Sequence, residues 1–143
     1  MSLLTLHETI KLEEACARML QNTNIQFTGI INNKGRLVAG GFRKEFASFE
    51  TEKLAMLFME IYLDYSMRKE FDSILGKINF ITSHRQQTNV TAVPFDDNLI
   101  LILSEPSVDI ENIIEISKIM FNCCNKIENS KIENGLRPKR GRS

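Results

Sequence analysis

The chain has 143 residues, with 18 basic and 18 acidic side chains. This length suits one domain with one hydrophobic core. A hydrophobic content of 43% and a charged content of 25% are those of an ordinary globular protein. The zero net charge argues against a partner that is held by charge over the whole surface.

The cysteines and the apolar runs indicate in which cellular compartment the protein lies. The chain has three cysteines, and the only close pair, Cys123 and Cys124, is adjacent in sequence and poorly suited to disulfide geometry. No apolar run reaches the roughly 20 residues of a membrane span, and the first residues lack the basic and apolar regions of a signal peptide. We therefore expect a cytoplasmic protein without disulfides.

The first elements in chain order are a helix and a hairpin. Thr5 and Glu8 have the spacing of a capping box, and apolar residues at three- and four-residue intervals then predict an amphipathic helix over residues 5–21. Two β-rich runs follow, at 25–31 and around 37–39. The segment Asn32–Gly35 between them tolerates positive φ, so the two runs predict a β-hairpin.

A long helix is predicted from about residue 50 to residue 75, with a break near residues 67–70. It has two apolar stripes on different sides. The first stripe consists of Leu54, Phe58, Ile61 and Tyr65, and the second of Met56, Met59, Leu63 and Met67. A helix that lies on a sheet buries one stripe, so something else must cover the second.

Three strands are predicted next, at 78–83, 90–95 and 99–104. Asp96–Asn98 forms a tight turn between the last two strands. The strand 99–104 is apolar on both faces, which places it centrally with helices on both sides. Residues 108–126 predict a last amphipathic helix.

The chain end is basic. We expect one domain over residues 1–128 and a basic, disordered tail over residues 129–143. The charges that could contact an acidic partner are Arg137, Lys139, Arg140 and Arg142.

No set of residues has the spacing of a catalytic, cofactor or metal site. His7 and His84 lie in a helix start and a turn, with no second ligand at metal-binding spacing. The pair Asp96–Asp97 resembles an acid/base pair but fits ordinary hairpin chemistry better. Arg85, beside His84, is most simply a solvated residue in a turn. We expect a protein that is not an enzyme and has no cofactor.

The second stripe of the long helix has two interpretations. In one, the connector 43–49, with Phe46 and Phe49, folds back and covers it within the chain. In the other, the stripe is a subunit interface, because exposed apolar surface marks association and methionine is common at such surfaces. We favour the interface.

The order of elements, helix, hairpin, helix, three-strand meander and helix, resembles roadblock/LC7 domains and the wider profilin-like and longin-like folds. The residues that carry the resemblance are the hairpin 25–42, the two-striped helix and the hairpin Phe95–Leu99. The layout also resembles small uncharacterised archaeal proteins with an Arg-containing turn before a strand ending in Pro.

The resemblance implies an α/β (α+β) fold with a five-stranded antiparallel sheet in the order 2-1-5-4-3. It implies the first and last helices on one face and the middle helix on the other. It also implies a homodimer formed through the middle helix and the third strand, and a non-enzymatic adaptor or regulator of small GTPases, motor complexes or membrane-associated signalling. Two alternatives stay open: a nucleic-acid accessory protein that acts through its tail, and a PAS-like ligand sensor with a pocket between sheet and helix.

Overall fold

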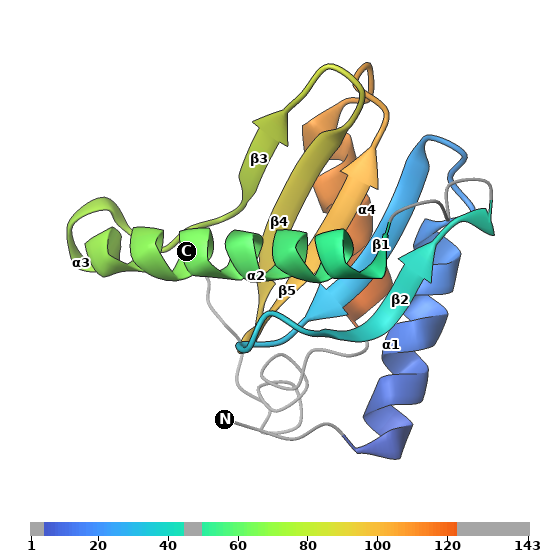
Figure 1. Ribbon diagram of the computed structural model, residues 1–143, viewed down its shortest axis with the longest axis horizontal. Coiled ribbons are helices and arrows are strands. Elements are labelled where there is room, and N and C mark those ends of the chain that lie inside the picture. The colour runs from blue at the N-terminus through green and yellow to red at the C-terminus, as the bar shows by residue number, and fades with distance from the viewer. Residues whose placement is uncertain (1–4, 45–49, 123–143) are drawn as a thin grey trace, which may run out of the picture.

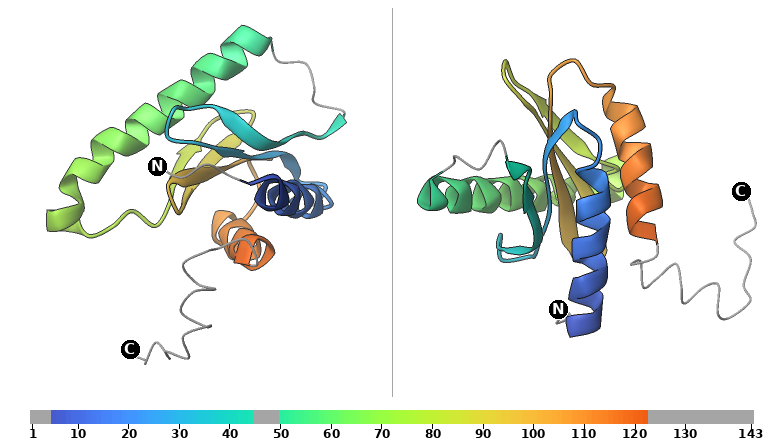
Figure 2. Two further views of the ribbon diagram at one scale, coloured as in Figure 1. Left: turned by 90° about the horizontal axis from the view of Figure 1, so that it is seen from below. Right: turned by 90° about the vertical axis from the view of Figure 1, so that its right-hand side faces the viewer.

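The computed structural model describes residues 5–44 and 50–122. These residues form a five-stranded antiparallel sheet in the order β2-β1-β5-β4-β3, as the resemblance implied. Helices α1 and α4 cover one face, and α2 crosses the other face (Figures 1 and 2). The tail residues and the connector 45–49 lie outside the described residues.

The strands alternate their side chains between two hydrophobic clusters. They are β1 (Ile25–Ile31), β2 (Leu37–Phe42), β3 (Ile81–His84), β4 (Asn89–Phe95) and β5 (Asn98–Ser104). In β5, Leu99, Leu101 and Leu103 belong to the cluster under α2, whereas Ile100 and Ile102 belong to the cluster under α1 and α4. The prediction that this strand is central and apolar on both faces is therefore confirmed.

Two helices share one face of the sheet. Helix α1 (Leu6–Met19) begins with the predicted capping box, in which the Thr5 hydroxyl accepts from the Glu8 amide at 3.1 Å. Helix α4 (Ile110–Phe121) begins at Asp109, whose carboxylate accepts from the amide of Glu111. Both helices bury their apolar sides in one cluster, so this face is covered from two directions.

The turns match their sequence chemistry. Gly35 has a φ of 72° at the tip of the first hairpin, where the Asn32 side-chain oxygen accepts from the amides of Lys34 and Arg36. In the β4–β5 hairpin, Asp96 has a φ of 54° between the paired residues at the strand ends. The two aspartates therefore form a two-residue turn, one residue shorter than the predicted Asp96–Asn98, because Asn98 already pairs with Phe95.

Helix α2 (Thr51–Arg68) ends where the break was predicted. A 3-10 turn (Lys69–Phe71) and the short helix α3 (Asp72–Leu75) continue it. The sheet order places β3 at one edge, and in Figure 1 the α3 end of this helical segment extends past that edge. The chain then returns to begin β3.

The starts of β3 and α4 were predicted wrongly. Strand β3 begins at Ile81 and not at residue 78, because the preceding residues return from α3 to the sheet, and Ile78 packs on the core without pairing in the sheet. Helix α4 begins at Ile110 and not at residue 108, and its described part ends at Phe121.

Arg43 links α1 to the sheet. Its guanidinium donates to the main-chain carbonyls of Leu20, Asn22 and Ile25, with 2.6 Å to Asn22 and 3.1 Å to Ile25. These carbonyls lie at the end of α1, in the following turn and at the start of β1. One side chain at the end of β2 therefore fixes the connection between α1 and β1.

Candidate subunit interface

Helix α2 lies directly on the sheet through its first stripe. Phe58 and Tyr65 are buried, and Leu54 and Ile61 pack against the same cluster. The ring of Phe58 lies 5.8 Å from that of Phe27 on β1, between ring centroids. Aromatic and aliphatic side chains thus fill the space between helix and sheet.

The second stripe points the opposite way. Its centre lies about 180° around the helix from the first stripe, at 3.6 residues per turn. Its four side chains are between 51% and 69% exposed. We call this surface the exposed stripe; it consists of Met56, Met59, Leu63 and Met67.

The exposed stripe is unusual for the surface of a monomer. A helix that packs on a sheet normally carries charged or polar residues on its outer side. Here the outer side carries four contiguous apolar residues, while the charges of Glu60 and Asp64 lie at its margin. Phe46 and Phe49, which could have covered the stripe within the chain, lie outside the described residues.

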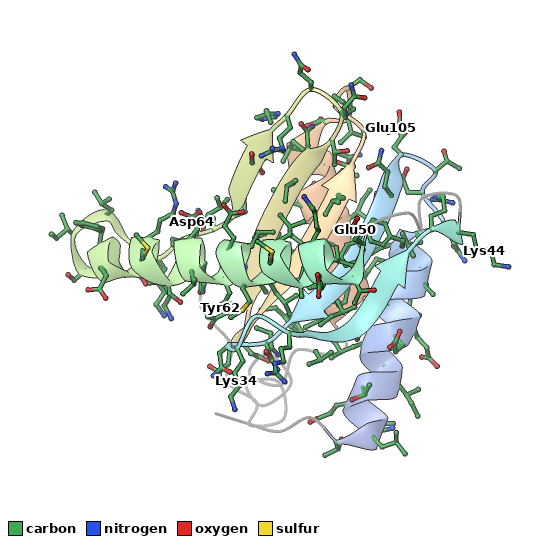
Figure 3. The ribbon with its side chains drawn as sticks, viewed as in Figure 1. Lys34, Lys44, Glu50, Tyr62, Asp64 and Glu105 are labelled. Carbon is green, nitrogen blue, oxygen red and sulfur yellow. The ribbon has the colours of Figure 1, made fainter. Side chains whose placement is uncertain are left out.

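The two margins of α2 have different neighbours. In Figure 3, Asp64 points to the side of α2 that faces β3, and Tyr62 points to the other side. The Tyr62 hydroxyl donates to the Asp97 carbonyl at 3.4 Å, and burial and then the Asp97 charge raise the pKa of Tyr62. Asp64 instead pairs with Arg68 at 3.1 Å.

A groove of about 1490 Å³ runs between α2 and the β3–β4 turn. Leu57 and Ile61 on the helix and Val90 and Leu103 on the sheet give it an apolar lining. Residues 83–88 of the turn form the opposite, polar wall. The groove lies between α2 and the sheet, and its helix wall includes Leu63 and Met67 of the exposed stripe. A pocket between sheet and helix is what a PAS-like ligand sensor needs, so that alternative stays a prediction.

A second exposed apolar surface follows α2, and sequence reasoning missed it. Phe71, Ile74 and Leu75 are 54%, 77% and 79% exposed. The sequence interpretation treated these residues as the end of a helix on the sheet, but the 3-10 turn and α3 extend past the sheet edge. We call the segment Phe71–Leu75 the arm. The predicted break near residue 67 was the signal that could have separated it from α2.

The other candidate residues do not form a site. His7 is exposed in the first turn of α1, and the His84 Nδ1 lies 3.1 Å from the Asn89 side-chain oxygen across β3 and β4. Arg85 is exposed in the turn. The tail residues Arg137, Lys139, Arg140 and Arg142 lie outside the described residues, as do Cys123 and Cys124.

Residues 5–44 and 50–122 hold neither a metal-binding cluster nor a membrane-spanning helix. No three His, Cys, Asp or Glu side chains in these ranges lie close enough to hold a metal ion. In the same ranges, no helix has the length and apolar character needed to cross a membrane.

Solved structures share the fold at low sequence identity. A roadblock/LC7 domain from Streptomyces avermitilis is 8% identical with a TM-score of 0.62, and the match covers 88% of this chain and 98% of that one. An MglB structure with a tetrameric arrangement is 12% identical with a TM-score of 0.68, covering 94% and 96%. A Schizosaccharomyces pombe profilin is 10% identical with a TM-score of 0.54, covering 87% and 99%. The roadblock/LC7-like and profilin-like fold is thus shown.

Comparison of sequences, in contrast to comparison of structures, identifies a family. No curated protein matches the chain. Residues 6–127 match a family of unknown function, DUF6659.

Proposed function

The chain belongs to this family of unknown function, and on that premise we propose that it is a non-enzymatic, homodimeric adaptor or regulatory module. Its exposed stripe is the subunit interface. The dimer presents the remaining surface of the two domains to a protein partner.

The exposed stripe carries the proposal. Four contiguous apolar side chains on the outer side of one helix expose surface that association would remove from water. The stripe runs along a single helix, and a two-fold axis across such a helix packs the stripe of one copy against the stripe of the other, with each contact occurring twice. Three methionines give the stripe side chains that adapt to a facing copy.

The fold supports the proposed homodimer and also suggests a class of protein partner. The similar MglB structure has a tetrameric arrangement, so self-association occurs on this fold. The likeness to roadblock domains suggests a small GTPase as the partner of the dimer. The resemblance concerns the fold alone, so the GTPase is the part of the proposal that most needs its own measurement.

The interface is tested with the full chain by light scattering over a range of concentrations. Met59→Glu and Leu63→Glu each place a carboxylate in the centre of the stripe, and we expect the dimer dissociation constant to rise at least about 100-fold. Ile119→Glu is the matched control, because Ile119 is 73% exposed on α4, on the other face of the sheet. We expect this control to dimerise like the parent.

The outcomes separate the two parts of the proposal. Folded Met59→Glu and Leu63→Glu chains that remain dimers would remove the interface assignment. The partner is tested by adding the parent chain to a small GTPase from the same organism and measuring GTP hydrolysis and nucleotide exchange. Unchanged rates would remove the GTPase and leave the dimer standing.

A further inference from the structure

The exposed stripe has an acidic residue at each end. Glu52 lies one helical turn before Met56, the first residue of the stripe, and both are exposed. Glu70 lies one turn after Met67, the last residue of the stripe, and is also exposed. A third exposed acid, Glu60, lies beside the centre of the stripe. Negative charge therefore borders the apolar surface of α2 along its length.

The nearby cations offset little of this charge. Lys53 is an exposed cation in the first turn of the same helix. Arg68 pairs with Asp64 at 3.1 Å, so these two residues add no net charge. Lys69 is turned to the inner side of the helix, where its Nζ lies 5.4 Å from the ring centroid of buried Tyr65. We call the remaining charged residues the rim, which has three carboxylates, one ammonium and a net charge of −2: Glu52, Lys53, Glu60 and Glu70.

A two-fold interface brings these rims together. In a homodimer that pairs the two stripes, each rim faces the rim of the second copy, because both partners use the same surface. Two rims of the same sign then meet around the apolar contact, whether the helices pair in parallel or antiparallel. Like charges that face each other across an interface weaken association. A cationic segment at the rim would therefore strengthen the proposed dimer.

The chain carries such a segment at its end. Residues 135–143 contain no acid, and they hold four basic residues, which leaves 14 basic against 18 acidic side chains in the rest of the chain. We call this part of the tail the basic segment; its cations are Arg137, Lys139, Arg140 and Arg142. The most basic stretch of the chain is thus opposite in charge to the rim.

The described chain ends close to α2, with one hairpin between them. The last turn of α4 contacts the β4–β5 hairpin through Phe121, whose ring centroid lies 5.9 Å from that of Phe95. Helix α2 contacts the same hairpin from the other face of the sheet, because the Tyr62 hydroxyl donates to the Asp97 carbonyl at 3.4 Å (Figure 2). The first cation of the basic segment lies 15 residues after the last described residue, and a chain of that length spans up to about 50 Å. The basic segment is therefore long enough to pass this hairpin and reach the rim.

We propose that the basic segment binds the rim of the exposed stripe and stabilises the homodimer by neutralising the two rims. This inference rests on the proposed homodimer and gives the tail a function within it. The contact is electrostatic and lies at the edge of the interface, so its strength depends on salt. A polyanion that captures the basic segment would compete with the rim and loosen the dimer.

The first experiment compares dimer dissociation constants of full-length chains by analytical ultracentrifugation. The neutral-tail variant carries Arg137→Gln, Lys139→Gln, Arg140→Gln and Arg142→Gln. At about 20 mM salt, where the Debye length is roughly 20 Å, we expect its dimer to be weaker than the parent dimer on the order of 10-fold. At about 500 mM salt, where the Debye length is roughly 4 Å, the two chains should dimerise alike.

A control variant removes cations from another surface. Arg18→Gln and Lys118→Gln together neutralise two exposed cations on α1 and α4, on the face of the sheet opposite to α2. We expect this control to dimerise like the parent at both salt concentrations. A loss equal to that of the neutral-tail variant would show an effect of total charge, and would overturn the assignment to the rim.

The second experiment locates the contact with a double-mutant cycle at low salt. The rim variant carries Glu52→Gln and Glu60→Gln, and it is measured in the parent and in the neutral-tail chain. In the neutral-tail chain these substitutions only remove repulsion and should tighten the dimer several-fold. In the parent they also remove the partner of the basic segment, so the gain should be smaller or absent. Glu111→Gln with Glu115→Gln on α4 is the matched control, and it should show no coupling to the tail.

The outcomes distinguish this inference from the dimer itself. A neutral-tail variant that dimerises as tightly as the parent at low salt, while Met59→Glu is a monomer, would overturn the tail contact and keep the proposed interface. Strictly additive effects of rim and tail, or coupling of the tail to the α4 acids instead, would also overturn it. A parent chain that is a monomer at all accessible concentrations would overturn both proposals.

Discussion

The two faces of the sheet are covered in different ways. On one face, α1 and α4 lie together and their apolar sides share one cluster with β1 and β5. On the other face, α2 lies alone among the described helices, and only its first stripe is buried. We call these the paired-helix face and the single-helix face.

The difference lies in the outer sides of the helices. The outer sides of α1 and α4 carry many charges, with Glu13, Glu14 and Arg18 exposed on α1 and Glu111 and Lys118 exposed on α4. They also expose three large apolar side chains, those of Leu6, Ile10 and Ile119. The outer side of α2 carries the four apolar residues of the exposed stripe. Among the described residues, the paired-helix face thus exposes fewer large apolar side chains than the single-helix face, whose exposed stripe is a surface suited to a second molecule.

Phenylalanines from the two faces give the largest expected contrast. Phe121 on α4 is 1% exposed and its ring lies 5.9 Å from that of Phe95, so Phe121→Ala should lower the free energy of unfolding by about 3–5 kcal/mol. Phe71 in the arm is exposed, so Phe71→Ala should change the free energy of unfolding by less than about 0.5 kcal/mol. Urea unfolding measures both.

This comparison needs a monomeric background, because dimerisation adds to the apparent stability. Both alanine variants are therefore made in the Met59→Glu chain. Equal losses of stability for the two variants would contradict the distinction between the buried core of the paired-helix face and the exposed arm.

A smaller contrast concerns the hairpin that supports α2. Gly35 has a positive φ, and a Cβ there would lie 2.9 Å from the Met59 Cα, so Gly35→Ala should lower the free energy of unfolding by about 2 kcal/mol. Gly41→Ala is the control, because a Cβ at Gly41 meets no atom within 4 Å. Urea unfolding checks both variants, and equal effects would mean that the hairpin tip does not constrain the helix.

The fold was largely predictable because its signals are local and agree with each other. The Thr5 capping box, the positive-φ residues at the first hairpin and the Asp96–Asp97 turn each specify a boundary from a few neighbouring residues. The two-sided apolar pattern of 99–103 placed β5 at the centre. The start of β3 was missed because a β-rich run does not reveal where a neighbouring strand begins to pair.

The candidate site was predictable only in part. The exposed stripe follows from helical periodicity, since Met56, Met59 and Leu63 cannot face the sheet together with Phe58. The arm could not be predicted in this way, because its exposure depends on where the sheet ends beneath the helix. The groove also brings together residues far apart in sequence. The Arg43 link has no local signature either, since its three carbonyl partners lie about twenty residues away.

The smallest expected effect concerns pH and the buried side of α2. Burial, and then neighbouring Tyr62 and carboxylates, raise the pKa of Tyr65 above its usual value near 10, as burial does for Tyr62. The folded state therefore holds these protons more tightly than the unfolded state, so the resulting stabilisation is complete below pH 10 and is lost as the pH rises through the folded-state pKa values. Urea unfolding at a series of alkaline pH values should show this loss, and Tyr65→Phe should reduce it. An unchanged pH dependence in Tyr65→Phe would mean that Tyr65 is solvated, and that α2 covers the sheet less tightly than the paired helices cover the other face.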